Sequence, residues 1–225
     1  MLNVQLRPHR TLGLILLLGV LLTGCSSDSD NPMTPAGPTA VGGNVSKGPI
    51  MGATVNLLSI QANGSPGAVA LGPFTTDPAG IWTGEIPVGG PVGPFVISST
   101  GGEYMDESTE KYLNIIGKTL YGLYKGNPSQ VTPLTHTTYI GMQHLVAGST
   151  SLTDAIAQAT ASSVTAFGFD FATTVPRNTA TATTAEKQYA ALLGGLSVLV
   201  DDNPALSAFD SSHPLDLILG LSTDM

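Results

Sequence analysis

Glycine and proline are much denser in the first half of this chain than in the second. Residues 41–100 contain 12 Gly and 7 Pro, whereas the longer stretch 128–225 contains 6 Gly and 5 Pro. Both residue types destabilise the interior of a helix, so breakers at this density exclude long helices from residues 41–100. We therefore expect short strands there and helices in the second half.

Short β-rich segments lie between these breakers. Residues 53–57 alternate between apolar and polar side chains, and residues 95–97 are aromatic or β-branched. Residues 119–124 extend the strand-rich region, whose end we place near Gly126. Strands at this spacing, with no helices between them, favour an antiparallel β-sandwich of the Ig-like kind over residues 41–126.

Two turn signals support this strand assignment. Asp77-Pro78-Ala79-Gly80 has Asp, Pro and Gly where a type I turn favours them. Asn63-Gly64 suits a tight hairpin connection between two strands. Both signals predict chain reversals between short strands rather than crossovers through helices.

The second half of the chain contains residues typical of helix starts and helix ends. Thr132-Pro133 is typical of a helix start, and we expect that helix to end at Gly148. Ser151-x-x-Asp154 is a variant of the capping box and opens a second helix, which Gly168 closes.

The clearest helix signal follows. Thr183-x-x-Glu186 is a capping box, and apolar residues continue after it at helical spacing. Residues 212–221 are a fourth, shorter candidate. Residues 127–225 are therefore expected to form a helical region, and the chain as a whole an α+β fold with strands first.

The first 25 residues have the parts of a secretory signal in order. Arg7 and Arg10 precede an apolar run at residues 11–23, and Leu22-Thr23-Gly24-Cys25 ends it. A helix that spans a bilayer needs about 20 apolar residues, so this run is too short to cross a membrane. The alternatives are an ordinary signal peptide or a buried segment with a chance cysteine.

The LTGC ending resembles the lipobox of bacterial lipoproteins. In that family the cysteine thiol receives a diacylglyceryl group and the signal is cut before it. The resemblance implies that residues 1–24 are a removable signal peptide and that Cys25 is the lipid-attachment site. Because Ser26 and not Asp follows the cysteine, the sorting pattern of Gram-negative lipoproteins implies the outer membrane, on either face. Residues 25–40 read as a flexible tether.

Composition narrows the classes of partner. The chain has 8 Lys and Arg against 16 Asp and Glu, and its net charge of −8 becomes −10 once Arg7 and Arg10 leave with the signal. So few cations cannot neutralise many phosphates, which excludes nucleic acid as a partner. The single cysteine excludes an intramolecular disulfide framework.

A second resemblance covers roughly residues 41–135. The signature residues are Gly48, Pro49, Gly52-Ala53-Thr54-Val55, Thr76-Asp77 and Gly80-Ile81-Trp82. Their pattern is similar to the carboxypeptidase-regulatory-like domain found in a group of bacterial lipoproteins. The resemblance implies a transthyretin-like β-sandwich that serves adhesion, spacing or substrate contact, and the matching residues are turn and core positions rather than catalytic ones.

Acidic residues gather in one place. Glu103, Asp106, Glu107 and Glu110 are weak calcium candidates, because carboxylate oxygens are the ligands that calcium prefers. The cluster lacks the order of an EF-hand loop, so a solvated hairpin is the alternative. We expect no other cofactor.

Other candidate chemistry is sparse. Ser108-x-x-Lys111 matches S-x-x-K of the serine β-lactamase group, but the companion motifs are missing and we regard the match as accidental. His136, His144 and His213 are too scattered to propose a triad or a metal site.

A covalent cross-link is a further hypothesis. Lys47 and Glu85 lie in different expected strands, as the lysine and the assisting acid do in surface sandwiches that form isopeptide bonds. The alternative is an exposed lysine at a bend.

These patterns together favour a binding role over catalysis. We expect a lipid-anchored lipoprotein of the outer membrane or cell surface, not an enzyme, whose sandwich binds an envelope protein or a glycan. Two alternatives stay open: an accessory part of an anchored hydrolase, and a structural subunit of a surface assembly. The membrane, through Cys25, is the one partner that a motif predicts.

Overall fold

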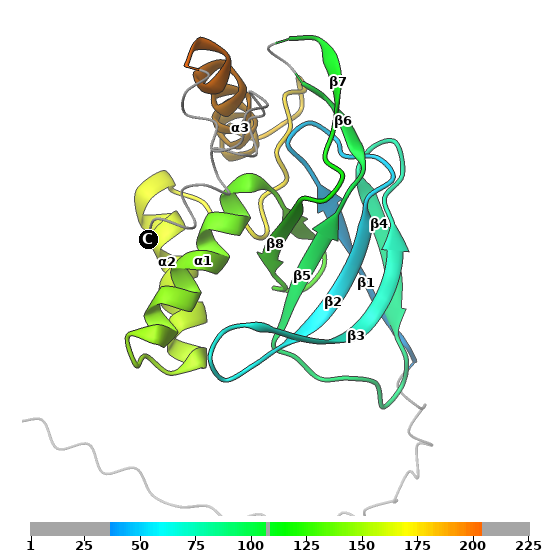
Figure 1. Cartoon of the computed structure of the whole chain (residues 1–225), viewed down its shortest axis with the longest axis vertical. Coiled ribbons are helices and arrows are strands. Elements are labelled where there is room, and N and C mark those ends of the chain that lie inside the picture. The colour runs from blue at the N-terminus through cyan, green and yellow to red at the C-terminus, as the bar shows by residue number, and fades with distance from the viewer. Residues whose placement is uncertain (1–36, 107–108, 204–225) are drawn as a thin grey trace, which may run out of the picture. The chain divides into compact units, whose positions relative to one another are not determined.

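The computed structural model describes residues 37–106 and 109–203, and its strands precede its helices (Figure 1). This confirms the predicted α+β class. The strands are β1 (Thr39–Val45), β2 (Thr54–Ile60), β3 (Pro66–Thr75), β4 (Ile81–Ile86), β5 (Phe95–Thr100), β6 (Glu103–Asp106), β7 (Lys111–Asn114), β8 (Thr119–Leu123) and β9 (Ser129–Val131). The helices are α1 (Pro133–Ala147), α2 (Leu152–Phe167) and α3 (Thr184–Asp202).

Several predictions concern residues outside these ranges. The signal peptide at 1–24, most of the tether, and the helix candidate at 212–221 lie there. So do Cys25, Glu107, Ser108 and His213.

The strands form two larger sheets and one hairpin. One sheet has the order β4-β1-β9, the second has the order β3-β2-β5-β8, and β6 pairs with β7. All pairs are antiparallel except β1 with β9. The predicted turn after β3 is confirmed, because the Gly80 N–H donates to the Asp77 carbonyl oxygen at 2.9 Å.

The strand β9 corrects two expectations. It lies past Gly126, where we placed the end of the strands, and it runs parallel to β1 rather than antiparallel. Parallel neighbours need a long crossover connection, and here all of β2 to β8 intervenes. A strand of three residues directly before a helix cap is too short to show a two-residue period.

One hydrophobic cluster draws on both larger sheets. Val41 and Val45 of β1 and Trp82 of β4 pack with residues such as Leu57 of β2 and Ile97 of β5. All five side chains are buried. The two sheets therefore exclude water from a common core, which is the main driving force for their association.

The helices begin and end where the capping signals predict. Thr132, Ser151 and Thr183 are the N-caps of α1, α2 and α3, and each side chain accepts a backbone N–H of the first turn. Gly168 ends α2 in the left-handed conformation, with φ of 83°.

The helices pack on the strands rather than standing apart. Tyr139 and Met142 of α1 and Ala155 of α2 share a buried cluster with Val96 of β5 and Leu123 of β8. In Figure 1, α1 lies between α2 and the sheet that contains β8. The described strands and helices belong to one compact unit. Within residues 37–106 and 109–203, no helix combines the length and apolar character of a membrane span.

Candidate functional site

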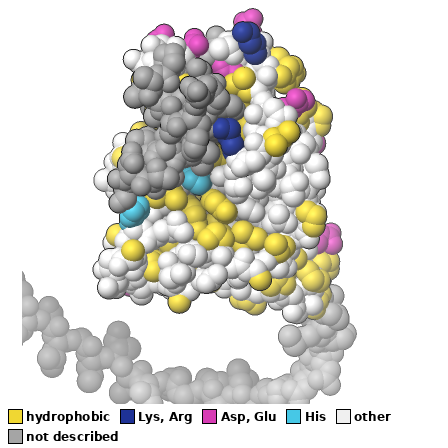
Figure 2. All heavy atoms as spheres, in the orientation of Figure 1, with side chains coloured by type: hydrophobic (Ala, Val, Ile, Leu, Met, Phe, Trp, Pro, Cys, Tyr) yellow, Lys and Arg dark blue, Asp and Glu magenta, His cyan; other side chains and the backbone are white. Residues whose placement is uncertain are grey.

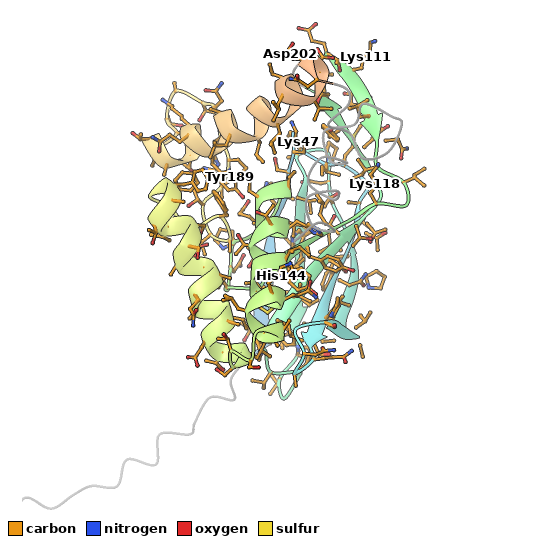
Figure 3. All side chains as sticks on the ribbon, turned by 60° about the vertical axis from the view of Figure 1, so that its left-hand side comes forward. Lys47, Lys111, Lys118, His144, Tyr189 and Asp202 are labelled. Atoms are coloured by element: carbon orange, nitrogen blue, oxygen red, sulfur yellow. The ribbon has the colours of Figure 1, made fainter. Side chains whose placement is uncertain are left out.

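Lys47 lies in the turn that follows β1, and its side chain is almost completely buried, with 1% exposed. Its Nζ donates a short hydrogen bond to Ser197 Oγ of α3 and lies 5.8 Å from the centre of the Tyr104 ring. Figure 3 shows Lys47 below α3, on the side that faces the strands. The alternative of an exposed lysine at a bend is therefore wrong.

Ser197 in turn contacts Asp106 at the end of β6. The Ser197 hydroxyl donates to Asp106 Oδ2 at 2.6 Å, and Asp106 Oδ1 accepts the backbone N–H of Thr109 at 3.1 Å. Ser197 and Asp106 are each 1% exposed. We call these three residues the Lys47–Ser197–Asp106 network. It joins the β1 turn, the β6–β7 hairpin and α3 through buried, hydrogen-bonded groups.

The geometry of the network suits support rather than catalysis. A nucleophilic serine needs a base that accepts its proton and a space where substrate can reach its oxygen. Ser197 Oγ accepts from the Lys47 ammonium while its hydrogen goes to Asp106, and it is buried. A buried cation and anion bridged by one hydroxyl satisfy each other, so the network fastens α3 to the strands.

Sequence reasoning missed this network because its partners are far apart. Lys47 and Ser197 are separated by 150 positions, which no local pattern can connect. One signal was present. Ser197 follows Leu193 by four positions and precedes Val200 by three, so it lies on the buried face of α3. A lone serine on an apolar stripe indicates a polar partner from another element.

A second buried contact fastens the start of α3. The Tyr189 hydroxyl lies 2.6 Å from Thr132 Oγ1 and donates to the Phe171 carbonyl oxygen. Burial raises the pKa of Tyr189, so its hydroxyl keeps its hydrogen at every physiological pH. Figure 3 shows Tyr189 below α3, near the start of α1. The helix is thus tied down at both ends of its buried face.

A pocket of about 330 Å³ with a mixed polar and apolar lining lies beside the network. Its polar lining residues are Asn44, Ser46, Lys47, Arg177 and Asn178, and its apolar ones include Val175 and Leu193. Arg177 pairs with Glu186 at 3.6 Å. Hydrogen bonds from the Thr183 backbone and side chain lower the pKa of Glu186, and Arg177 lowers it further. The pocket therefore offers amide and hydroxyl groups. The positive charges of Lys47 and Arg177 are already compensated by Asp106 and Glu186.

The acidic cluster does not gather around one point in the structure. Asp106 belongs to the network, whereas Glu110 is exposed in the turn before β7. Glu103 is half-buried at the start of β6. Over the ranges 37–106 and 109–203, no group of three or more His, Cys, Asp or Glu side chains could hold a metal ion. The calcium site stays a prediction, and Glu107 lies outside the described residues.

Lys47 and Glu85 are not brought together. Glu85 is exposed on β4 opposite Ala40, near the start of β1, whereas Lys47 follows the other end of β1. The structure therefore contradicts Glu85 as the acid that assists a cross-link at Lys47. Lys111 is exposed at the start of β7.

The two described histidines have different surroundings. His136 is buried in α1, its Nδ1 accepts the Tyr121 N–H at 3.1 Å, and its ring stacks on that of Tyr121. Burial lowers the pKa of His136 to about 4. His144 is exposed two turns later on the same helix. Neither belongs to a ligand set, so His136 is a packing residue.

Acidification is expected to destabilise the fold through His136. Its pKa is about 4 in the folded chain and 6.5 when unperturbed, so between these values the unfolded chain binds a proton that the folded chain does not. The contribution is complete above pH 6.5 and is lost as the pH falls towards 4, by about 3 kcal/mol in all. Urea denaturation at several pH values measures this loss.

A matched pair of variants isolates the effect. His136→Asn keeps an acceptor near the position of Nδ1 and removes the titrating group, so it is expected to flatten the pH dependence. His144→Gln changes an exposed histidine and is expected to leave it unchanged. An unchanged slope in His136→Asn would contradict the assignment.

Comparison with known proteins adds no relative. No protein-family model matches the sequence, and no curated protein or solved structure matches it significantly. The resemblances to lipobox lipoproteins and to the carboxypeptidase-regulatory-like domain therefore stay predictions from the sequence.

Proposed function

We propose that this protein is a lipid-anchored outer-membrane lipoprotein, not an enzyme, whose β-sandwich presents a binding surface for an envelope protein or a glycan. The observation that carries the proposal is Leu22-Thr23-Gly24-Cys25 at the end of a short apolar run. An acyl group on Cys25 would hold the folded unit at a membrane without a spanning helix.

The arrangement of the strands supports the sandwich. Two sheets of three and four strands share one hydrophobic cluster, and most of their pairs are antiparallel. Both features are typical of β-sandwiches. A transthyretin-like sandwich is the form that the resemblance at residues 41–135 implies.

The buried network supports a role without catalysis. Among residues 37–106 and 109–203, Lys47 and Asp106 are the polar side chains that contact the Ser197 hydroxyl, and all three side chains are buried. Such a network is a means of rigidifying a scaffold. Binding modules gain affinity from rigid surfaces because little conformational freedom is lost on binding.

The pocket beside the network supports a polar ligand. Asn44, Ser46 and Asn178 supply hydrogen-bonding groups of both kinds. Such groups can pair with the hydroxyls of a glycan or with the backbone of a protein segment.

Replacement of the anchor cysteine tests the proposal. The wild-type protein is expected to fractionate with the outer membrane, whereas Cys25→Ala is expected to lose that association while keeping its fold. Immunoblots of separated membranes measure the distribution, and the melting temperature of each purified chain serves as the folding control. Equal membrane association of the two proteins would contradict the lipid anchor.

A further inference from the structure

The loop between β4 and β5, residues 87–94, exposes two large apolar side chains. Val88 is 64% exposed and Val92 is 92% exposed. Because neither valine is covered within the folded unit, the loop presents apolar surface to its surroundings. Three prolines, Pro87, Pro91 and Pro94, fix φ at their own positions in this loop, which also contains three glycines.

The same loop has no charged residue, although the mature chain carries a net charge of −10 once Arg7 and Arg10 are removed. Along the sequence the nearest charged residues are Glu85 of β4 and Glu103 of β6, and both are acidic. In Figure 2 the Lys and Arg side chains visible on this face lie in its upper half, away from the lower edge that the loop forms in Figure 1. The loop itself therefore adds no charge to the repulsion between the acidic chain and an anionic surface.

The chain leaves the folded unit towards Cys25 beside this loop. An open hollow of about 610 Å³ is lined by the loop together with Gly37, Thr39, Phe95 and Tyr124. Gly37 is the first described residue, and β1 begins at Thr39. Residues 26–36 span at most about 40 Å when fully extended. An anchor at Cys25 therefore keeps this edge within about 40 Å of the membrane.

We propose that the 87–94 loop contacts the lipid bilayer, with Val88 and Val92 at the level of the headgroups. This inference rests on the proposed function, because the lipid on Cys25 brings the loop to the surface. Two valines are too few to hold a protein on a membrane alone, but a tether turns their binding into a local event at high effective concentration. The contact would fix which end of the molecule faces the membrane. The pocket beside the network, at the opposite end of β1, would stay exposed to ligands.

A second copy of the chain is a weaker occupant. The expected lipid on Cys25 ties this edge to a membrane, whereas no such tether is expected between two copies. The hydrocarbon core of the bilayer is apolar, and the segment between Cys25 and this edge is expected to hold the edge close to it.

Site-directed fluorescence tests the contact. The chain has one cysteine, so in the acylated protein an engineered cysteine is the only thiol open to labelling. Val92→Cys places an environment-sensitive dye on the loop. Ile116→Cys is the matched control. Ile116 is 78% exposed and lies in the turn before Thr119. Thr119 pairs with Thr100, which is at the end of β5 farthest from the 87–94 loop. Both labelled proteins are reconstituted into vesicles of phosphatidylethanolamine and phosphatidylglycerol with brominated acyl chains.

The expected result is a blue shift and about twofold quenching of the dye at position 92, with little change at position 116. Vesicle flotation, measured on the same samples, separates the proposed lipid anchor at Cys25 from the proposed membrane contact of the 87–94 loop. Protein that floats but shows no quenching at position 92 would overturn the loop contact and leave the anchor standing. Protein that does not float would overturn both. A blue shift at position 92 that also appears at high protein concentration without vesicles would overturn the contact in favour of self-association.

Discussion

Replacing Lys47 by methionine is expected to lower the free energy of unfolding by about 3–5 kcal/mol. The substitution keeps the length of the side chain but removes the ammonium that donates to Ser197. Asp106 and the Ser197 hydroxyl would then stay buried with one fewer charged partner. Breaking a buried pair in this way costs more than the pair contributes, because it leaves a charge without compensation in a medium of low dielectric.

Two further variants test whether this loss of stability comes from the network. Lys187→Met removes an exposed lysine from α3 and is expected to change stability by less than about 0.5 kcal/mol. Ser197→Ala removes the bridging hydroxyl and is expected to cost about 1.5–3 kcal/mol. Chemical denaturation measures all three, and the double variant gives the coupling energy between the two positions. Equal stability of Lys47→Met and Lys187→Met would show that the network does not fasten α3.

Replacing Gly43 by alanine is expected to cost at least about 3 kcal/mol. Gly43 lies in β1 opposite Ser129 of β9, and an added Cβ would stand 1.7 Å from the Ser129 carbonyl oxygen. No side-chain rotation relieves a clash with backbone, so β9 must move away from β1. Because β9 leads directly into α1, this shift would also disturb the packing of the helix.

The control for Gly43 is another glycine with open space around it. Gly194 lies in α3, and an added Cβ there meets nothing within 4 Å. Gly194→Ala is expected to stabilise the chain by about 0.5–1 kcal/mol, because alanine favours the helix. Urea denaturation compares the two variants with the wild type. A Gly43→Ala protein as stable as the wild type would contradict the close approach of β1 and β9.

Features encoded by neighbouring residues could be read from the sequence. The N-cap at Thr132, the capping box at Thr183 and the helix end at Gly168 depend on contacts within one or two turns of chain. The density of Gly and Pro likewise placed the strands before the helices. In each case the pattern and the structure that it forms lie in the same stretch of sequence.

Features built by distant residues could not be read in this way. β9 is a strand because β1 offers it an edge, and its own three residues carry no periodic signal. Lys47 resembled a surface residue because its partners, Ser197 and Asp106, lie in other elements. The acidic cluster shows the same limit, since clustering in sequence did not reveal that Asp106 is buried.

The mass of the mature protein tests the central claim most directly. The protein is extracted from outer membranes of cells that express the full chain, and its N-terminal peptide is analysed by mass spectrometry. The account predicts a chain that begins at Cys25 and carries a diacylglyceryl group on the thiol, with or without an acyl group on the new amine. A chain that retains residues 1–24, or one with an unmodified Cys25 thiol, would contradict it.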